Sequence, residues 1–240
     1  MTKTPGIDGR IALRGGILGA WAAFFIWLWL SGEMSRYLGP RTYWVIPFGA
    51  VTLGGAALAH VYLARSTSPR HIAYADVGRS VLLIVPLVAA VMVPNADLGA
   101  LAASRKATGA GLATANVPSA DEVDPIENPG FKDIHYADES DRYARATGVI
   151  PGKEVTLVGF VSEDGGVAGT FDLTRFYVSC CAADAIPYSV AIEPPSDFSG
   201  SLKPDTWLRA RGPLELRRDR LVVAATTLEA VPDPEDPYLY

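Results

Sequence analysis

The 240-residue chain is predicted to be an α+β membrane protein, in which three N-terminal transmembrane helices precede a small all-β, OB-like five-stranded barrel. Two observations predict this class. Long uncharged apolar stretches and four of the five tryptophans lie within the first hundred residues. After about residue 150, apolar residues alternate with polar ones in short runs separated by turn residues, which is typical of strands. The net charge of −5 and the mean hydropathy of +0.19 therefore average two chemically different parts.

Three apolar segments are predicted to cross a bilayer, because a transmembrane helix needs about 20 predominantly apolar residues. The expected helices cover about residues 13–33, 43–64 and 78–97 of a membrane domain at 1–98. The third segment is the shortest, and Arg79 at its start is expected to extend its charged end to the interface. The first segment follows basic residues, as a signal peptide would, but it is rich in tryptophan and no small-residue cleavage site follows. We therefore expect a retained helix.

The orientation is predicted from the basic residues of the short loops, which favour the cytoplasmic side. The N-terminal part, up to the start of the first helix, carries Lys3, Arg10 and Arg14. The connection between the second and third helices, up to the start of the third, carries Arg65, Arg70 and Arg79, whereas the loop between the first and second helices carries only Arg36 and Arg41. We expect a multi-pass protein of the cell membrane, with a cytoplasmic N-terminus and an extracytoplasmic C-terminal domain.

Residues 99–130 combine Ala, Gly, Ser, Thr, Pro and acidic residues without a sustained apolar period, which predicts a flexible linker. The extracytoplasmic β domain is expected at 131–240. It should open with a short helix over 137–148, for which Asp138 and Ser140 are suitable N-caps.

Period-two apolar patterns predict five strands in the β domain, at 154–163, 171–179, 187–193, 206–216 and 220–231. Gly159 and Gly212 fall inside these patterns, where a small barrel requires sharp bends. An OB-like barrel fits this spacing best, and an open five-stranded sandwich is the alternative. The domain is acidic apart from the short run RRDR at 217–220, so no nucleic-acid partner is expected. The expected core, which should let the domain fold alone, is Val155, Leu157, Phe171, Leu173, Val190, Ile192, Trp207, Leu221 and Val223.

The only two cysteines, Cys180 and Cys181, are adjacent. Thiolates are soft ligands that bind zinc or copper, and Asp184 would add an oxygen and His135 a nitrogen if the fold brings them near. Because neighbouring strand residues point to opposite faces, Cys180 is expected to face the core and Cys181 the solvent. Two structural interpretations stay open: a vicinal disulfide, and a buried Cys180 that acts as a small core residue.

No enzyme constellation is found, so no catalytic or cofactor-binding residue is expected. The chain has no glycine-rich phosphate loop, no HExxH motif and no Ser/His/Asp set in a supporting context. In the second apolar segment, Gly54 and Gly55 with Ala50 and Ala57 form a small-residue face suited to helix packing, which suggests a partner in the membrane.

The run F-x-L-x-R-F-x-x-x-C-C-A-A-D-A-x-P, from Phe171 to Pro187, resembles the signature of the YcgQ-like family of bacterial two-component permease subunits. The sequences G-F-V at 159–161, D-x-W-x-x-x-R-G at 205–212 and the closing D-P-Y-L-Y extend the resemblance. One departure is that Tyr188 and Ser189 stand where family members often have Val-Gly.

The resemblance implies an accessory subunit of the bacterial inner (plasma) membrane that works beside a larger, multi-spanning permease of an arsenic-exporter-like type. It singles out Arg175, Cys180, Cys181 and Asp184. The β domain would dock on the transporter or deliver cargo to it. The alternative function is an extracytoplasmic thiol-based chaperone for metal or redox chemistry, anchored in the lipid bilayer and working without a permease.

Overall fold

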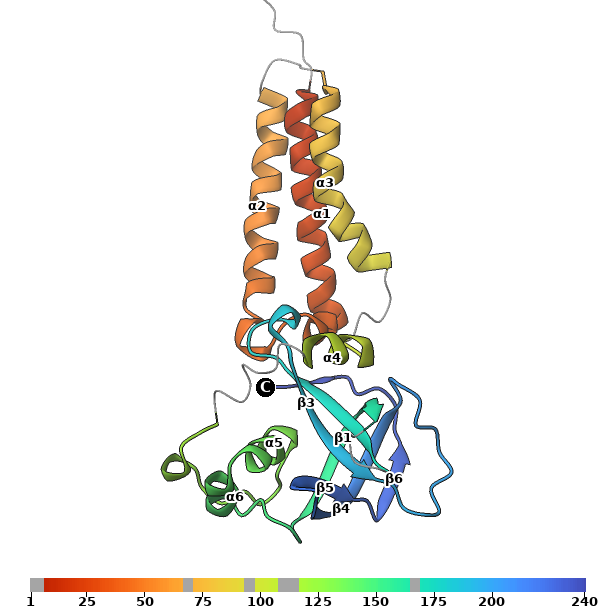
Figure 1. Ribbon diagram of the computed structural model, residues 1–240. Helices are drawn as coiled ribbons and strands as arrows, with labels where there is room; N and C mark the ends of the chain where they lie inside the picture. The colour runs from red at the N-terminus through yellow and green to blue at the C-terminus, as the bar shows by residue number, and fades with distance from the viewer. Residues whose placement is uncertain (1–6, 67–70, 93–97, 108–116, 165–168) are drawn as a thin grey trace, which may run out of the picture. The chain divides into compact units, whose positions relative to one another are not determined.

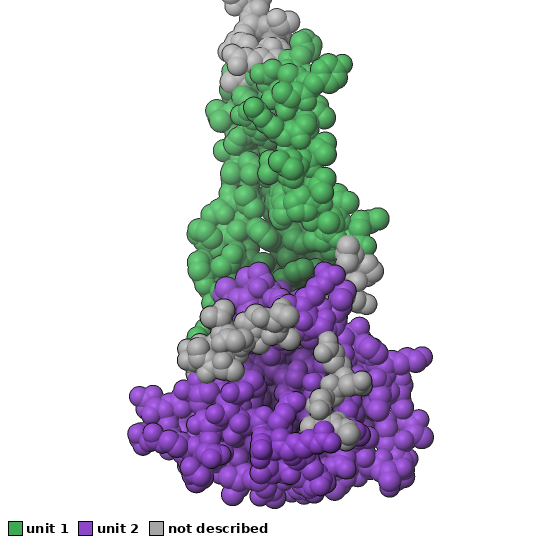
Figure 2. All heavy atoms as spheres, in the orientation of Figure 1, with its two compact units in different colours: residues 1–96 green, residues 97–240 purple. Residues whose placement is uncertain are grey.

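The computed structural model of the protein describes residues 7–66, 71–92, 98–107, 117–164 and 169–240 (Figure 1). The chain divides into two compact units, Met1–Ala96 and Asp97–Tyr240 (Figure 2). Lys3, Arg70, the predicted end of the third helix and the middle of the predicted linker lie outside the described residues.

The first unit consists of helices, α1 (Gly9–Ser31), η1 (Glu33–Arg36), η2 (Pro40–Thr42), α2 (Val45–Ser66) and α3 (Tyr74–Met92). Three helical segments are long and apolar enough to cross a membrane, Gly9–Ser31, Pro40–Ser66 and Tyr74–Met92. The prediction of three such helices is confirmed. Helix α3 begins earlier than expected and contains Pro86. Because proline lacks a backbone N–H and crowds the preceding turn, α3 bends in its second half (Figure 1).

The ends of α1 follow the ordinary rules of capping. The Asp8 carboxylate accepts hydrogen bonds from the backbone N–H groups of Arg10 and Ile11, at 3.0 and 3.2 Å. Gly32, with a φ of 77°, ends the helix in the left-handed conformation. The backbone N–H of Asp8 also donates to the carbonyl of Ala64 at 3.0 Å, which places the start of α1 beside the end of α2.

The predicted small-residue face of α2 packs against α1. Ala50 and Ala57 are buried, and a Cβ on Gly54 would lie 3.9 Å from the Cβ of Ala22 on α1. A Cβ on Gly55, by contrast, would meet nothing within 4 Å. Small residues let two backbones approach closely, and here most of this face is used inside the chain. The suggestion of a separate membrane partner stays a prediction.

The second unit contains a barrel and short helices, which are α4 (Ala100–Ala107), η5 (Ala120–Glu122), α5 (Phe131–Glu139), α6 (Asp141–Thr147), β1 (Glu154–Asp164), β2 (Phe171–Tyr177), η6 (Ala182–Asp184), β3 (Ile186–Glu193), β4 (Trp207–Arg217), β5 (Arg220–Ala224), β6 (Thr227–Ala230) and β7 (Tyr238–Leu239). The strand order is β1-β2-β3-β5-β4, and β4 pairs back with β1. The sheet therefore closes into a five-stranded barrel. Only the β3–β5 pair within the barrel is parallel. The predicted OB-like barrel is confirmed, and the open sandwich is wrong.

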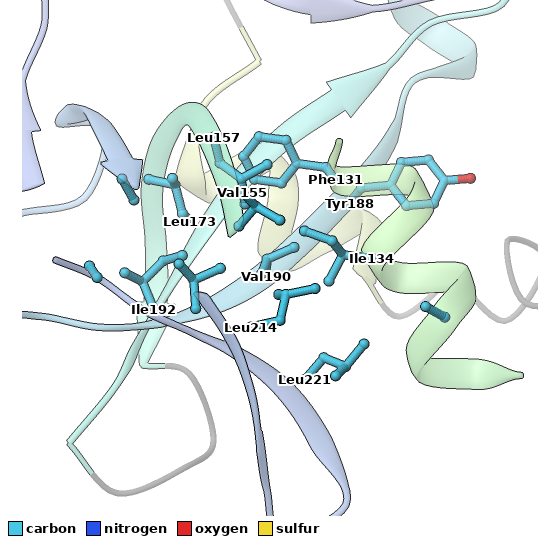
Figure 3. Packing of buried hydrophobic residues seen from close by; sticks show 14 of the residues in the cluster. Phe131, Ile134, Val155, Leu157, Leu173, Tyr188, Val190, Ile192, Leu214 and Leu221 are labelled. Carbon is cyan, nitrogen blue, oxygen red and sulfur yellow. The ribbon is translucent and has the colours of Figure 1, made fainter. Parts of the chain in front are cut away.

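The barrel interior is filled by the alternating apolar residues of its strands. Leu157, Leu173, Ile192 and Leu214 are fully buried there, together with Ile134 of α5, which covers the barrel core (Figure 3). The predicted core positions belong to this cluster with one exception. Trp207 is only partly buried and packs in a second cluster, because the inward position of β4 is taken by its neighbour Leu208.

Two glycines permit the close approach of strands. A Cβ on Gly159 would lie 2.6 Å from the carbonyl oxygen of Thr174 and 2.8 Å from the ring of Phe131. A Cβ on Gly212 would overlap the carbonyl of Ala224. No other residue type fits either position without moving backbone, so close contact between strands requires both glycines, which were predicted to allow sharp bends.

The helical segment before the barrel differs in detail from the prediction. Two helices are present, α5 and α6, and Ser140 caps the second by accepting the Tyr143 N–H at 3.3 Å. Asp138 is not a cap. Its carboxylate accepts the backbone N–H of Leu221 at 2.7 Å and so joins α5 to the start of β5.

The expectation of a flexible linker at 99–130 is wrong for the part that the structure describes. Residues 100–107 form α4, and Val117, Val123 and Ile126 pack against the main core. Helix α4 contributes Ala100 and Ala103 to the second cluster, with Phe160, Phe176, Val178, Ala185 and Tyr238. Helix α4 therefore buries the surface of the barrel that carries the second cluster.

Candidate metal centre

The adjacent cysteines lie in a tight loop between β2 and β3. Strand β2 ends at Tyr177, and the single turn η6 follows the cysteines. The Asp184 carboxylate closes the loop, because Oδ1 accepts the Ser179 N–H at 3.1 Å and Oδ2 accepts the Cys180 N–H at 2.8 Å. Asp184 is therefore first of all a loop-forming residue.

Lys106 of α4 holds the other side of the loop. Its Nζ donates to three backbone carbonyls, those of Ala182 at 3.3 Å, Ala183 at 3.1 Å and Ala185 at 3.1 Å. An ammonium has three donors, and all of them are used here. A cation is favourable at this place, because the free carbonyls of a helical turn carry partial negative charge.

Helix α4 is itself fixed by a distant residue. Asp205 accepts the backbone N–H of Ala100 at 2.6 Å, at the first turn of the helix. Asp205 opens the D-x-W-x-x-x-R-G motif, and it has a positive φ of 66°. The motif that supported the family resemblance thus anchors the helix that carries Lys106. Sequence reasoning missed both residues, because a lysine in an apparent linker has no local signal for a contact 76 residues away.

The two sulfurs and the carboxylate form one compact group. The ligand atoms of Cys180, Cys181 and Asp184 all lie within 4.8 Å of one another. Both cysteines are free thiols, and the Cys180 thiol donates to the Cys181 sulfur with the two Sγ atoms 3.8 Å apart. A disulfide would bring these atoms to about 2.05 Å, so the arrangement described is not a vicinal disulfide.

The expected exposure of the two cysteines is reversed. Cys180 is exposed, and Cys181 is half-buried. The physical reason is that β2 stops three residues before Cys180, so strand alternation does not extend to the pair. The inward position next to the loop is taken by Val178, which is fully buried. A buried Cys180 acting as a core residue is therefore wrong.

The Cys180 thiol and the Asp184 carboxylate have pKa values that are shifted in opposite directions. The hydrogen bond to the negatively charged Asp184, and then that to Cys181, raise the pKa of Cys180 to about 11. For Asp184, burial acts to raise the pKa, but the hydrogen bonds from Cys180, Ser179 and Cys181 outweigh it and leave that pKa below its usual value. At neutral pH the site therefore holds an ionised carboxylate beside a protonated Cys180 thiol, and ion binding there releases a proton.

The donor set fits a tetrahedral soft ion. Two sulfurs bound to zinc at about 2.3 Å in tetrahedral geometry lie about 3.8 Å apart, whereas two sulfurs on opposite sides of an ion would lie about 4.6 Å apart. The separation of 3.8 Å matches the first case. A carboxylate oxygen gives a third donor. Three protein ligands leave the fourth position open, unlike the closed four-ligand sites that stabilise folds.

His135 does not join this group. Among the described residues, the only cluster of potential metal ligands is Cys180, Cys181 and Asp184. His135 lies on α5, with its ring 5.2 Å from that of Tyr188, and its Nε2 is buried without a hydrogen bond among the described residues. Burial lowers its pKa, against the opposing effects of Glu139 and Asp138. The suggested nitrogen ligand is therefore wrong.

Arg175 serves the fold. Its guanidinium donates to the carbonyls of Asp236 at 2.6 Å, Pro237 at 3.3 Å and Val158 at 3.4 Å, and it lies 5.9 Å from the Trp207 ring. These contacts hold the C-terminal segment, whose strand β7 pairs with β2 beside Arg175. These contacts give Arg175, which the family resemblance singles out, a structural role.

Comparison with known families gives one match. The family described as the DUF1980 C-terminal domain matches residues 120–240, half of the chain. A search of curated proteins found no match. The matched residues contain the whole barrel, the Cys180–Cys181 loop and the C-terminal segment with β7. This match agrees with the predicted YcgQ-like family. The chain therefore belongs to the family defined by the DUF1980 C-terminal domain, here joined to three helices apolar enough to span a membrane.

Proposed function

We propose that this protein is the accessory subunit of a membrane permease and that its barrel unit carries a soft metal ion, zinc or copper, as cargo. The observation that carries the proposal is the group of two free thiols and one carboxylate within 4.8 Å, on a chain with three apolar helices. The permease partner is what the family resemblance implies. The proposal includes no enzymatic activity.

The accessibility of the site supports a cargo role over a structural one. A structural zinc site is closed and has four protein ligands, whereas this group offers three and has Cys180 exposed to solvent. A three-ligand site leaves room for a donor from another molecule, as stepwise ligand exchange requires. Its rigidity comes from Asp184 and Lys106, which hold the backbone of the loop, so ion release need not disturb the barrel.

The basic residues of the loops support an orientation. Arg10 and Arg14 lie in the first two turns of α1, Arg65 lies in the last turn of α2, and Arg79 lies in the second turn of α3. Under the positive-inside rule these ends belong to the cytoplasm. We therefore place the barrel unit outside the cytoplasm, at the bacterial inner (plasma) membrane. Reporter fusions after residues 70 and 130 should give opposite signals, and two cytoplasmic signals would refute this topology.

A partner within the membrane is supported by the exposed apolar surface of the helices. Helix α3 has no buried residue, and large side chains such as Phe48, Leu58 and Leu82 are exposed. Lipid covers such surfaces in any membrane protein, so they do not identify the partner. Copurification after mild solubilisation tests it. A stable complex with a multi-spanning protein supports the permease subunit, and recovery of the protein alone favours the second candidate, a thiol-based metal or redox chaperone.

Metal titration of the purified full chain tests the site itself. Wild-type protein should bind one equivalent of zinc or copper(I), and the thiols should resist alkylation once the ion is bound. Cys180→Ser and Cys181→Ser should each abolish this binding, while Asp197→Asn, an exposed acidic residue outside the group, should not change it. Equal metal uptake by the wild type and by both cysteine variants would refute the metal site.

A further inference from the structure

We propose that the first unit contains a site for one anionic phospholipid, whose phosphate binds between Arg14 of α1 and Arg79 of α3 and whose acyl chain lies in the groove between these helices. This site is distinct from the cysteine loop, and its test does not depend on the cargo or partner proposed above.

The polar half of the site is a cavity of about 320 Å³ near the start of α1 and α3. Arg10, Arg14, His60, Asp76 and Arg79 supply its polar lining. All three helices contribute, so the cavity belongs to their packing and not to one helix end. Three arginines against one carboxylate leave a formal excess of two positive charges.

One of the arginines is neutralised inside the chain. Arg10 forms an ion pair with Asp76 at 2.9 Å, and its Nε donates to the carbonyl of His71 at 3.2 Å. Arg14 and Arg79 are exposed, and among residues 7–66 and 71–92, which the structure describes in this unit, neither has an ion-pair partner. Two guanidinium groups facing one cavity repel each other unless an anion lies between them. Phosphate is the anion whose geometry the planar guanidinium matches best.

His60 lies on α2 in the same cavity and has a defined tautomer. Its Nδ1 is 2.9 Å from the carbonyl oxygen of Ala56, an atom that only accepts, so Nδ1 carries a hydrogen. Nε2 is then the ring atom that remains for a ligand. It can accept from a hydroxyl of the headgroup.

The apolar half of the site is continuous with this cavity. Leu13, Ile17 and Ser80 line both the cavity and a groove of about 860 Å³ between α1 and α3. Along α3 the groove extends from Val77 to Ala89. At 1.5 Å per residue this is about 18 Å of helix. One leaflet of the hydrocarbon core is about 15 Å thick, so the groove has the length of one acyl chain.

The combination of a cationic cavity and an apolar groove favours a phospholipid over a free phosphate ion as the ligand. A phosphate alone would use the cavity and leave the groove without an occupant of its own. Gly16 of α1 lines the groove, and a Cβ added at this position would meet nothing within 4 Å. A larger residue at this position would therefore fill the groove without disturbing the packing of the helices.

Native mass spectrometry of the detergent-solubilised full chain tests the proposal, with phosphatidylglycerol, phosphatidylcholine and inorganic phosphate as probes. Wild-type protein should retain one phosphatidylglycerol and bind phosphatidylcholine at least tenfold more weakly. Arg14→Gln with Arg79→Gln should weaken phosphatidylglycerol binding by roughly 10- to 100-fold, the range for lost hydrogen bonds to charged groups. Arg14→Lys with Arg79→Lys should restore part of it, because lysine keeps the positive charge without the planar fork of the guanidinium.

Two further variants sharpen the result. Arg65→Gln removes one arginine from the end of α2 outside the cavity, and it should bind phosphatidylglycerol like the wild type. Gly16→Leu should reduce lipid binding at least fivefold while all the charges remain. Equal binding of the two lipids, or loss of binding in Arg65→Gln as large as in the Arg14/Arg79 variant, overturns the proposal. Displacement of the lipid by millimolar inorganic phosphate, with no effect of Gly16→Leu, overturns the lipid assignment in favour of a free anion.

Discussion

The charge of Asp184 should control the reactivity of Cys180. The Asp184 carboxylate is the largest cause of the high Cys180 pKa, about 11 against an ordinary 9.0. Asp184→Asn keeps the shape of the side chain, removes the charge and replaces one of the two accepting oxygens by an NH2 group, so a loosened loop has to be distinguished from the charge effect. With Cys181→Ser in the background, Cys180 is the only thiol in the chain and can be followed alone.

The expected magnitude follows from the thiolate fraction. Only the ionised sulfur reacts, and Asp184 is the largest of several causes of the raised pKa of Cys180. At pH 8 a fall in pKa from about 11 toward the ordinary 9.0 therefore raises the fraction of thiolate by at most about a hundredfold. A less basic thiolate is also a weaker nucleophile, by a factor of roughly 6 to 10 over two pKa units. The net prediction is an increase of up to about tenfold in the labelling rate.

Stopped-flow labelling of the detergent-solubilised full chain with a disulfide reagent, between pH 6 and 10, measures this effect. Because Cys180 is already exposed, better access is not expected to raise the rate. A charge effect lowers the midpoint of the pH profile, whereas an opened loop would change the rate at every pH. Asp197→Asn, which removes a charge outside the loop, should leave the profile unchanged. An unaltered midpoint in Asp184→Asn would refute the assigned contact between carboxylate and thiol.

Three further predictions concern stability. His135 has a lowered pKa in the folded state, so the unfolded chain binds an additional proton below pH 6.5. The contribution of His135 to the free energy of unfolding should therefore be complete above pH 6.5 and fall below it. In urea denaturation, His135→Gln should make the free energy of unfolding less dependent on pH. Arg218→Asn with Asp219→Gly should raise the free energy of unfolding by about 0.5–1 kcal/mol. Both residues have positive φ (51° and 61°) in the β4–β5 turn, a conformation that Asn and Gly adopt more easily. An unchanged urea midpoint would contradict this. A fragment of residues 97–240 should melt several degrees above one of 117–240, since α4 covers the second cluster; equal melting temperatures would show that α4 adds nothing.

Much of the barrel was predictable because its signals are local. Period-two alternation marked β1 to β5, and Gly159 and Gly212 stood out inside these patterns as positions of special backbone geometry, although the close contact between strands was seen only in the structure. Arg218 and Asp219 form the tip of the hairpin between β4 and β5, and this turn lies between two of the predicted strands. Closure of the sheet was also inferable, because five short strands with tight connections leave few other arrangements.

Helix α4 was missed because its stability is not local. It has eight residues, and an isolated helix of this length is unstable in water whatever its composition. Ala100 and Ala103 bury against Phe176 and Val178, residues far along the chain, and Asp205 supplies the first-turn hydrogen bond. The sequence of residues 99–107 gives no indication of these contacts, so it did not predict the helix.

The sequence by itself determined the two-part organisation, the three apolar helices, the five strands and the residues of the cysteine group. Each follows from periodicity, length or residue type within a short window. Only the tertiary structure decided which sulfur is exposed, that Lys106 holds the loop, and that His135 and Arg175 lie outside the metal-ligand group. These features depend on where β2 ends and on which distant segments pack beside it, and such contacts are selected by the whole core and not by neighbours in sequence.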